Sequence, residues 1–213
     1  MGQADARLRG PGVSEAIRPA ATLVLLRQGP TEPEVLMGMR GAQAVFMPSK
    51  YVFPGGGVDA ADHGAGTVAA LSDLCRHRLS LHVPDDSPAP DALAAAGLRE
   101  LAEETGLTLT EGAAHLRFIF RAITPPGRSR RFDARFFLVD AAHVVGDAED
   151  FSAASDELSH LHWIGIGAAR ALDLPFITEV VLAEVAAMLS GVPDQGVPFF
   201  DNSGAVPTFR RLV

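Results

Sequence analysis

The stretch Leu98-Arg99-Glu100-Leu101-Ala102-Glu103-Glu104-Thr105-Gly106-Leu107 has the pattern of the last turns of an amphipathic helix. At about 100° per residue, its three glutamates fall within roughly a 100° arc, and the leucines point the other way. Gly106 suits the left-handed residue that closes a helix. The stretch therefore predicts a helix with a stripe of carboxylates on one face and an apolar stripe on the other.

Three carboxylates on one stripe repel each other, and this repulsion needs compensation. Arg99, one turn before Glu103, can pair with it, but one cation does not balance three acids. A hard divalent cation such as Mg²⁺ or Mn²⁺, bound through carboxylate oxygens, would balance them. The alternative is a solvated acidic helix face, which is what most charge runs are. The lack of interleaved lysine and a glycine turn upstream favour the metal site.

Residues Arg99 to Leu107 resemble the second half of the Nudix box, R-E-U-x-E-E-x-G-U with U aliphatic, at every specified position. The first half of that box is a glycine, a Glu six residues later, and then a seven-residue gap to the Arg. Counted back from Arg99, Asp91 stands at the Glu position and Asp85 at the Gly position. Glycines occur instead in Phe53-Pro54-Gly55-Gly56-Gly57, far upstream. This split box resembles the coenzyme A diphosphatase-like branch of the superfamily, of the peroxisomal type.

The resemblance implies an α/β fold, a Nudix-type α/β/α sandwich with a mixed β-sheet and a helical insertion inside the box. It implies metal ligation by the carboxylates of Glu100, Glu103 and Glu104 and by the carbonyl of Gly55, with Arg99 steadying the cluster. In many Nudix proteins a Glu shortly before a strand tryptophan reaches the metals or orients water. Glu157 is the best match, and Asp156 is the second choice. The general base that would deprotonate the attacking water is left open between Glu100 and Glu157.

Arginines concentrate between residues 116 and 139, where two strands are predicted around a turn that contains Pro125-Pro126-Gly127. Alternation puts the even-numbered residues 132 to 138 on one face of the second strand and Asp133 on the other. Beside a metal site such clustering indicates a phosphate clamp, because guanidinium pairs bidentately with phosphate. An edge hairpin kept soluble by charge is the alternative. The candidate substrate-binding residues are Arg40, Arg121, Arg128, Arg131 and Arg135.

The predicted organisation is a flexible N-terminal arm (1–18), a Nudix hydrolase domain (19–190) and a C-terminal tail (191–213). The tail is expected to pack on the domain or on a partner subunit. An insertion covers about 59–87. Within it, residues 67–79 have helical periodicity, and Asp62 is interpreted as a loop residue. Ser87 and Pro88 predict the start of the glutamate helix.

Composition narrows the function classes. With 213 residues, a net charge of -8 and a pI near 5.3, the chain does not suit a general nucleic-acid binder. A small anionic substrate remains compatible, because metal ions reverse the local sign of a site. The single cysteine excludes an internal disulfide. No apolar run approaches the ~20 residues of a membrane span, so we expect no membrane partner and a cytoplasmic location.

These features together predict a Nudix hydrolase that acts on acid anhydrides in phosphorus-containing compounds with Mg²⁺ or Mn²⁺ as cofactor. The expected partner is a small nucleoside-diphosphate-X substrate, with coenzyme A or acyl-CoA favoured by the branch resemblance. ADP-ribose or NADH pyrophosphatase activity is the enzymatic alternative, and a non-catalytic nucleotide-sensing module is the other. A homodimer is left open.

Overall fold

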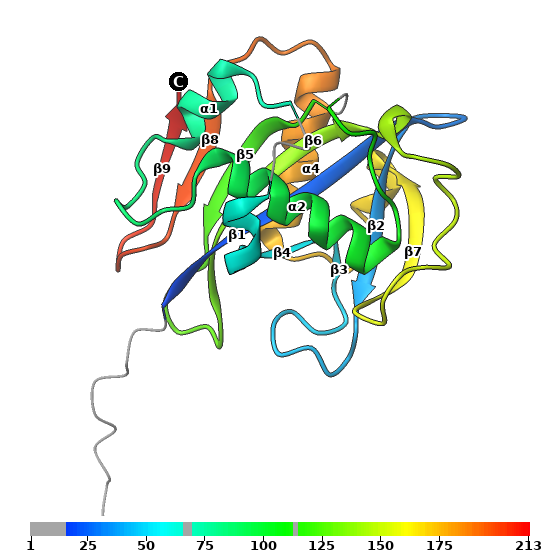
Figure 1. Cartoon of the computed structure of the whole chain (residues 1–213), viewed down its shortest axis with the longest axis horizontal. Helices are drawn as coiled ribbons and strands as arrows, with labels where there is room; N and C mark the ends of the chain where they lie inside the picture. The colour runs from blue at the N-terminus through cyan, green and yellow to red at the C-terminus, as the bar shows by residue number, and fades with distance from the viewer. Residues whose placement is uncertain (1–15, 66–69, 113–114) are drawn as a thin grey trace, which may run out of the picture.

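The fold is described from a computed structural model of residues 16–65, 70–112 and 115–213 (Figure 1). Its centre is one mixed sheet whose strands lie in the order β3-β2-β1-β6-β5-β8-β9, with β4 paired to β1 and β7 paired to β2. The strands are β1 (Ile17–Gln28), β2 (Pro33–Arg40), β3 (Tyr51–Val52), β4 (Gly55–Gly57), β5 (Arg117–Ile123), β6 (Arg131–Asp140), β7 (Leu158–Gly165), β8 (Val197–Asp201) and β9 (Thr208–Leu212).

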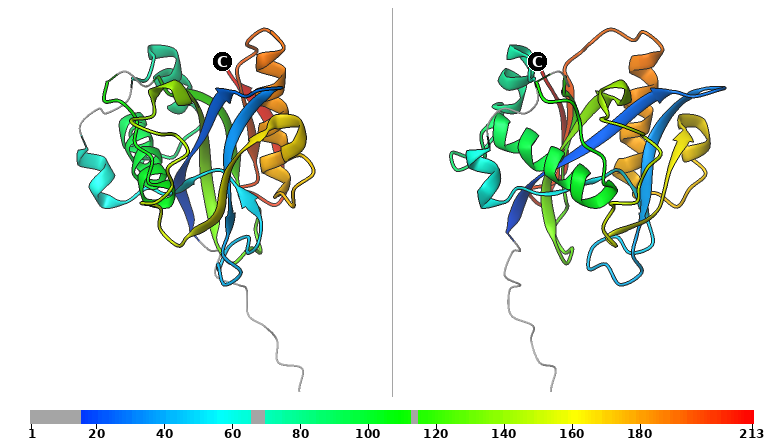
Figure 2. Two further views of the ribbon diagram at one scale, coloured as in Figure 1. Left: turned by 90° about the vertical axis from the view of Figure 1, so that its right-hand side faces the viewer. Right: turned by 45° about the vertical axis from the view of Figure 1, so that its right-hand side comes forward.

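Helices cover both faces of this sheet, as Figure 2 shows in its edge-on view. The helices are η1 (Ala60–Gly64), α1 (Asp73–Leu79), α2 (Pro90–Thr105), η2 (Ala141–His143), α3 (Ile166–Ala169) and α4 (Phe176–Leu189). The predicted class, an α/β sandwich with a mixed sheet, is confirmed. The long central strand β1 runs parallel to β6 and antiparallel to β2 and β4, which makes it the strand on which the layers are assembled.

Two apolar layers hold the helices to the sheet. Leu93, Ala96 and Leu101 of α2 pack with Leu23 of β1 in one cluster, and α4 packs with the opposite face in the other. The alternation predicted for β6 is confirmed, since Ala134, Phe136 and Leu138 belong to the α4 layer and Phe137 belongs to the α2 layer. Because the apolar stripe of α2 packs against the sheet, its acidic stripe lies on the side of the helix that faces β4.

The start of α2 differs from the prediction. The helix begins at Pro90 with Ala89 as its N-cap, two residues later than Ser87 and Pro88 suggested. The cause is the second proline, because the residue before a proline is disfavoured in the α region, and Ala89 is extended (ψ 153°). The predicted end of α2 is confirmed, since Gly106 follows its last residue with φ 75° and its N–H donates to the carbonyl of Ala102.

The insertion and the tail both pack on the domain. Helix α1 covers the second half of the helix predicted over 67–79, and residues 67–69 lie outside the described residues, as does most of the predicted arm. Arg76 of α1 pairs with Asp91 of α2 at 2.7 Å. Residues 191–213 supply β8 and β9, which extend the sheet beyond β5. Among the described residues, no helix has the length and apolar character needed to cross a membrane.

Candidate active site

The glycine triplet of β4 packs against the acidic stripe of α2. It pairs with Ala20, Ala21 and Thr22 of β1. A Cβ added to Gly56 would lie 2.3 Å from Oε1 of Glu100, so no side chain fits there. The absence of a side chain thus lets a glutamate of the helix approach the backbone of the strand, as the sequence predicts for this turn.

Arg99 joins the parts of this site. Its guanidinium donates to the carbonyl of Gly57 (2.9 Å), to Glu100 (2.9 Å) and to Glu103 (3.1 Å). It also donates through Nε and Nη2 to the two carboxylate oxygens of Asp62, both at 3.1 Å. These bonds, those to Asp62 first, raise the pKa of Arg99 above its usual value. One permanently charged side chain therefore links α2, the glycine strand and η1.

Asp62 is the residue that sequence reasoning missed. It was interpreted as a loop residue, but its side chain is only 4% exposed and is bound by Arg99. Burial raises the pKa of Asp62, but the hydrogen bonds from Arg99 and from the Asp59 N–H bring it below its ordinary value. The available signal was spacing, because Asp62 lies six residues after Gly56, the distance from glycine to acid in the first half of the Nudix box.

Asp62 falls inside the predicted insertion of about 59–87, and its carboxylate bonds Arg99 of α2. Asp91, which stands at the Glu position when counted back from Arg99, binds Arg76 of α1 instead. An acid at the distance that the first half of the box specifies is thus supplied by η1 and bonds Arg99. Counting back along the chain from Arg99 does not find it, because Asp62 lies 37 residues before Arg99.

Glu104 is the most enclosed carboxylate of the stripe. It is 2% exposed and accepts a hydrogen bond of 2.7 Å from the Gly55 N–H. Burial raises its pKa to about 8, against the lowering effects of the Gly55 N–H and Arg40, and with further raising by Glu100 and Glu157. Burial also raises the pKa of Glu100, with Arg99 opposing it and Glu103 and Glu157 adding to it. The site thus holds several acids that disfavour each other's ionisation.

Glu103, Glu157 and Arg40 lie around this pair. Glu103 is mostly exposed and is held by Arg99, so it faces solvent at the outer edge of the stripe. Glu157 is an exposed residue just before β7, and its charge acts on both Glu100 and Glu104. Arg40 ends β2 opposite Leu158, next to Glu157. Its Nε is buried and has no hydrogen-bond partner among the described residues.

The donor chemistry of this cluster fits a hard divalent cation. Glu100, Glu103 and Glu104, with Glu157 and the carbonyl of Gly55, offer oxygen ligands only, which Mg²⁺ and Mn²⁺ prefer. A cation beside Glu100 and Glu104 would offset the burial and mutual repulsion that raise their pKa values. Within residues 16–65, 70–112 and 115–213, no three His, Cys, Asp or Glu side chains already converge closely enough to hold an ion. Ligation would therefore require rotation of glutamate side chains.

The predicted arginine clamp divides into buried and exposed members. Arg121 and Arg135 are 1% exposed and flank Asp133, with N–O distances of 2.7 and 3.0 Å. Arg131 is 4% exposed and donates to the carbonyls of Thr124 and Asn202. These three side chains contact internal partners in this structure, although Nε and Nη2 of Arg135 have no hydrogen-bond partner among the described residues. Arg128, in contrast, is exposed in the β5–β6 turn.

Buried Arg121 also supports the insertion. It donates to the carbonyls of Leu81 (3.0 Å) and His82 (3.1 Å), which follow α1, and it lies 4.2 Å from the ring centroid of Phe199. Burial lowers the pKa of Arg135 to about 10, since Asp133 raises it only in part and Arg121 lowers it. The sequence could not separate these arginines, because the buried and exposed members share one hairpin. Their partners distinguish them, namely the carboxylate of Asp133 for Arg121 and Arg135 and two backbone carbonyls for Arg131.

Comparisons with known proteins agree with this geometry. No protein-family model matches the chain. A Caenorhabditis elegans protein named "Putative nudix hydrolase 7" is 30% identical over 161 residues, which cover 71% of this chain and 52% of that protein. The chain therefore spans about half the length of the curated relative it matches.

Solved structures extend the likeness to the fold. A Nudix hydrolase from Alicyclobacillus acidocaldarius has a TM-score of 0.61 and 27% identity, covering 81% of this chain and 92% of that one. The Nudix domain of Shewanella oneidensis NrtR, solved with ADP ribose, has a TM-score of 0.55 and 14% identity over 82% of this chain and 90% of its own. The fold is thus a Nudix fold, and the chain is similar in sequence to proteins named Nudix hydrolases.

Proposed function

We propose that this chain is a metal-dependent hydrolase that cleaves the diphosphate linkage of a nucleoside-diphosphate-X substrate. The observation that carries the proposal is the buried carboxyl of Glu104, bonded to the Gly55 N–H and crowded by Glu100 and Glu157. A purely structural helix face would not bury a carboxyl where its charged form is so disfavoured. A site that binds a cation gains from the same arrangement.

The proposed chemistry assigns separate tasks to the side chains. A divalent ion bound by Glu100, Glu103, Glu104 and the Gly55 carbonyl would neutralise phosphate oxygens and lower the pKa of water. Arg99 holds Glu100 and Glu103 in position, and its bonds to Gly57 and Asp62 anchor it to the strand and to η1. Either Glu100 or Glu157 accepts the proton from the attacking water.

Arg40 is the side chain best placed to bind the scissile diphosphate. Its charge acts on Glu104, so its guanidinium lies beside the proposed metal ligands. Its Nε is buried without a partner among the described residues, which leaves a donor for a phosphate oxygen. The buried arginines of the β5–β6 hairpin are not needed for this task.

Coenzyme A or an acyl-CoA is the substrate we favour, because the split box resembles the coenzyme A diphosphatase-like branch. The structure contributes one point in support, namely that residues 73–82, which lie between Asp62 and α2 in the sequence, contact α2 through Arg76 and the sheet through Arg121. ADP-ribose is the second candidate, since a domain of the same fold binds it. NADH is a further candidate, because it is also a nucleoside-diphosphate-X compound. A nucleotide sensor without activity is the non-enzymatic alternative.

Hydrolysis assays with Mg²⁺ or Mn²⁺ across coenzyme A, ADP-ribose and NADH test the proposal. We expect the wild-type chain to cleave at least one of these diphosphates, with Glu104→Gln and Glu103→Gln reducing the rate by orders of magnitude. Glu111→Gln removes an exposed glutamate outside the site and is the matched control. Tight binding of one nucleotide without cleavage under any metal would instead establish the sensor.

A further inference from the structure

Three exposed arginines at one end of the sheet have no carboxylate partner within 4.0 Å among the described residues. They are Arg18, Arg128 and Arg130, which we call the basic end. Most other surface arginines of this acidic chain are paired, namely Arg27, Arg76, Arg78, Arg117, Arg210 and Arg211. Arg170 is also exposed without such a partner, but it lies alone after α3.

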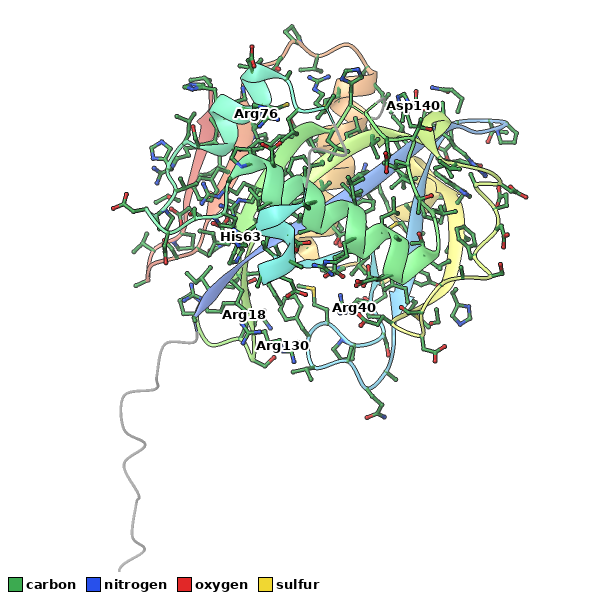
Figure 3. All side chains as sticks on the ribbon, in the orientation of Figure 1. Arg18, Arg40, His63, Arg76, Arg130 and Asp140 are labelled. Carbon is green, nitrogen blue, oxygen red and sulfur yellow. The ribbon has the colours of Figure 1, made fainter. Side chains whose placement is uncertain are left out.

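Separate parts of the chain bring these arginines together. Arg18 lies in β1 directly opposite Phe132 of β6, and Arg128 and Arg130 lie in the turn that leads into β6. Figure 3 shows Arg18 and Arg130 at the same end of the molecule, below α2, and Arg40 along the same edge. Gathering unpaired like charges is unfavourable, so the basic end suits an anion supplied from outside the described chain.

The basic end borders the proposed catalytic site. The Val58 N–H donates to the carbonyl of Pro19 (3.0 Å), so the glycine strand runs beside β1 as far as the residue next to Arg18. Gly56 pairs with Ala21, three residues from Arg18 and therefore about 10 Å away along the strand. A second connection runs through the loop that follows Arg40. Ser129 donates to the carbonyl of Val45 (3.1 Å).

Resting on the proposed function, we propose that the basic end binds a phosphate monoester that the substrate carries away from its scissile diphosphate. The preferred substrates would then be nucleoside-diphosphate derivatives with an additional phosphate. Guanidinium groups bind a dianionic phosphate through charge-assisted, bidentate hydrogen bonds. An extended polyanion is disfavoured because the chain carries a net charge of -8 and the neighbouring stripe is acidic. Three guanidiniums match one compact dianion.

Matched substrate pairs test this assignment, namely coenzyme A against 3′-dephospho-coenzyme A and NADPH against NADH. We expect the member with the extra phosphate to have a kcat/KM about tenfold higher in at least one pair, mainly through KM, because the contact is remote from the reacting atoms. The preference should weaken at high salt, as expected for exposed charges.

The double variant Arg128→Ala/Arg130→Ala should bring that ratio close to one, mainly by lowering kcat/KM on the member of each pair that carries the extra phosphate. The double lysine variant should give an intermediate ratio, since lysine keeps the charge but loses the bidentate geometry. Arg170→Ala is the matched control and should behave as wild type. Equal kcat/KM within both pairs, or a preference that survives in the double alanine variant, would overturn the assignment while leaving the hydrolase intact.

A binding measurement keeps the proposal testable if no substrate is cleaved. By calorimetry, adenosine 3′,5′-bisphosphate should bind wild-type protein about tenfold more tightly than AMP, and the double alanine variant should lose that difference. Selective binding without hydrolysis would refute the proposed function alone. Equal affinities for the two nucleotides would refute the proposal that the basic end binds a phosphate monoester.

Discussion

Replacing Asp62 by asparagine tests whether Arg99 and Asp62 form the link that holds the candidate site together. The substitution keeps the shape of the side chain and removes its charge, leaving the Arg99 guanidinium without its main partner. Breaking a buried pair costs about 3–5 kcal/mol. Arg99 is 24% exposed and keeps Gly57, Glu100 and Glu103 as acceptors, so we expect a smaller loss, of about 2–3 kcal/mol. In a chain of this size that lowers Tm by roughly 4–12 °C.

A second Arg–Asp pair that also includes a residue of α2 provides the control. Arg76 and Asp91 are joined by two hydrogen bonds of 2.7 Å, shorter than the 3.1 Å bonds of Arg99 to Asp62. Their side chains are 35% and 37% exposed, so Asp91→Asn should cost less than about 1 kcal/mol. Differential scanning calorimetry and urea unfolding of both variants measure the difference. Similar losses in the two variants would show that burial does not decide the strength of these pairs.

The pH dependence of the same pair has a defined sign. Because the folded pKa of Asp62 is lowered, its contribution to stability is present above the unfolded pKa of about 3.9 and is lost as pH falls through the folded value. The gap in unfolding free energy between wild type and Asp62→Asn should therefore be full near neutrality and close in acid. A gap that widens on acidification would contradict the assignment of charge to Asp62.

Three further outcomes follow from the same geometry. In EDTA, the protein should lose stability as pH rises from the unfolded carboxyl pKa of about 4.3 towards about 8, because the folded state keeps the Glu104 proton that the unfolded chain releases; Glu104→Gln should flatten this slope in urea titrations. Gly56→Ala should reduce hydrolysis strongly, since its Cβ would lie 2.3 Å from Glu100, and unchanged activity would refute the close approach. Asp133→Asn should cost about 3–5 kcal/mol, measurable by urea unfolding, because it leaves two buried arginines unneutralised.

Local patterns predicted much of the fold. The alternation in β6 and Gly106 after α2 each identify an element from residues that are adjacent in sequence. The glutamates of α2 and the glycine triplet were likewise predicted to meet, and Glu100 and Glu104 do contact Gly56 and Gly55. The elements could be predicted because helical and strand periodicities depend on neighbouring residues. The contact between Gly55 and Glu104, which are 49 residues apart, was instead implied by the resemblance to the Nudix box.

What the sequence did not predict depends on distant partners. Whether an arginine can bind substrate or supports the core depends on the partner with which it pairs. Asp133 forms ion pairs with Arg121 and Arg135 only when β5 and β6 are paired. Asp62 was missed for the same reason, because its partner Arg99 lies 37 residues away. The exposure of Glu103, in contrast to buried Glu104, also follows from how α2 lies against the sheet.

The long stretch of chain between Asp62 and Arg99 costs little in loop-closure entropy. Asp62 and Arg99 are 37 residues apart, against eight positions in a contiguous box. Loop-closure entropy grows by about 0.6 kcal/mol per doubling, so the longer loop costs roughly 1.3 kcal/mol. This is less than the loss we expect on breaking the pair, and Arg76–Asp91 and the bonds of Arg121 to Leu81 and His82 offset it further. The pair of Asp62 and Arg99 therefore outweighs the entropy cost of the longer loop, and through it Arg99 joins η1 to α2 and to the glycine strand that it also bonds.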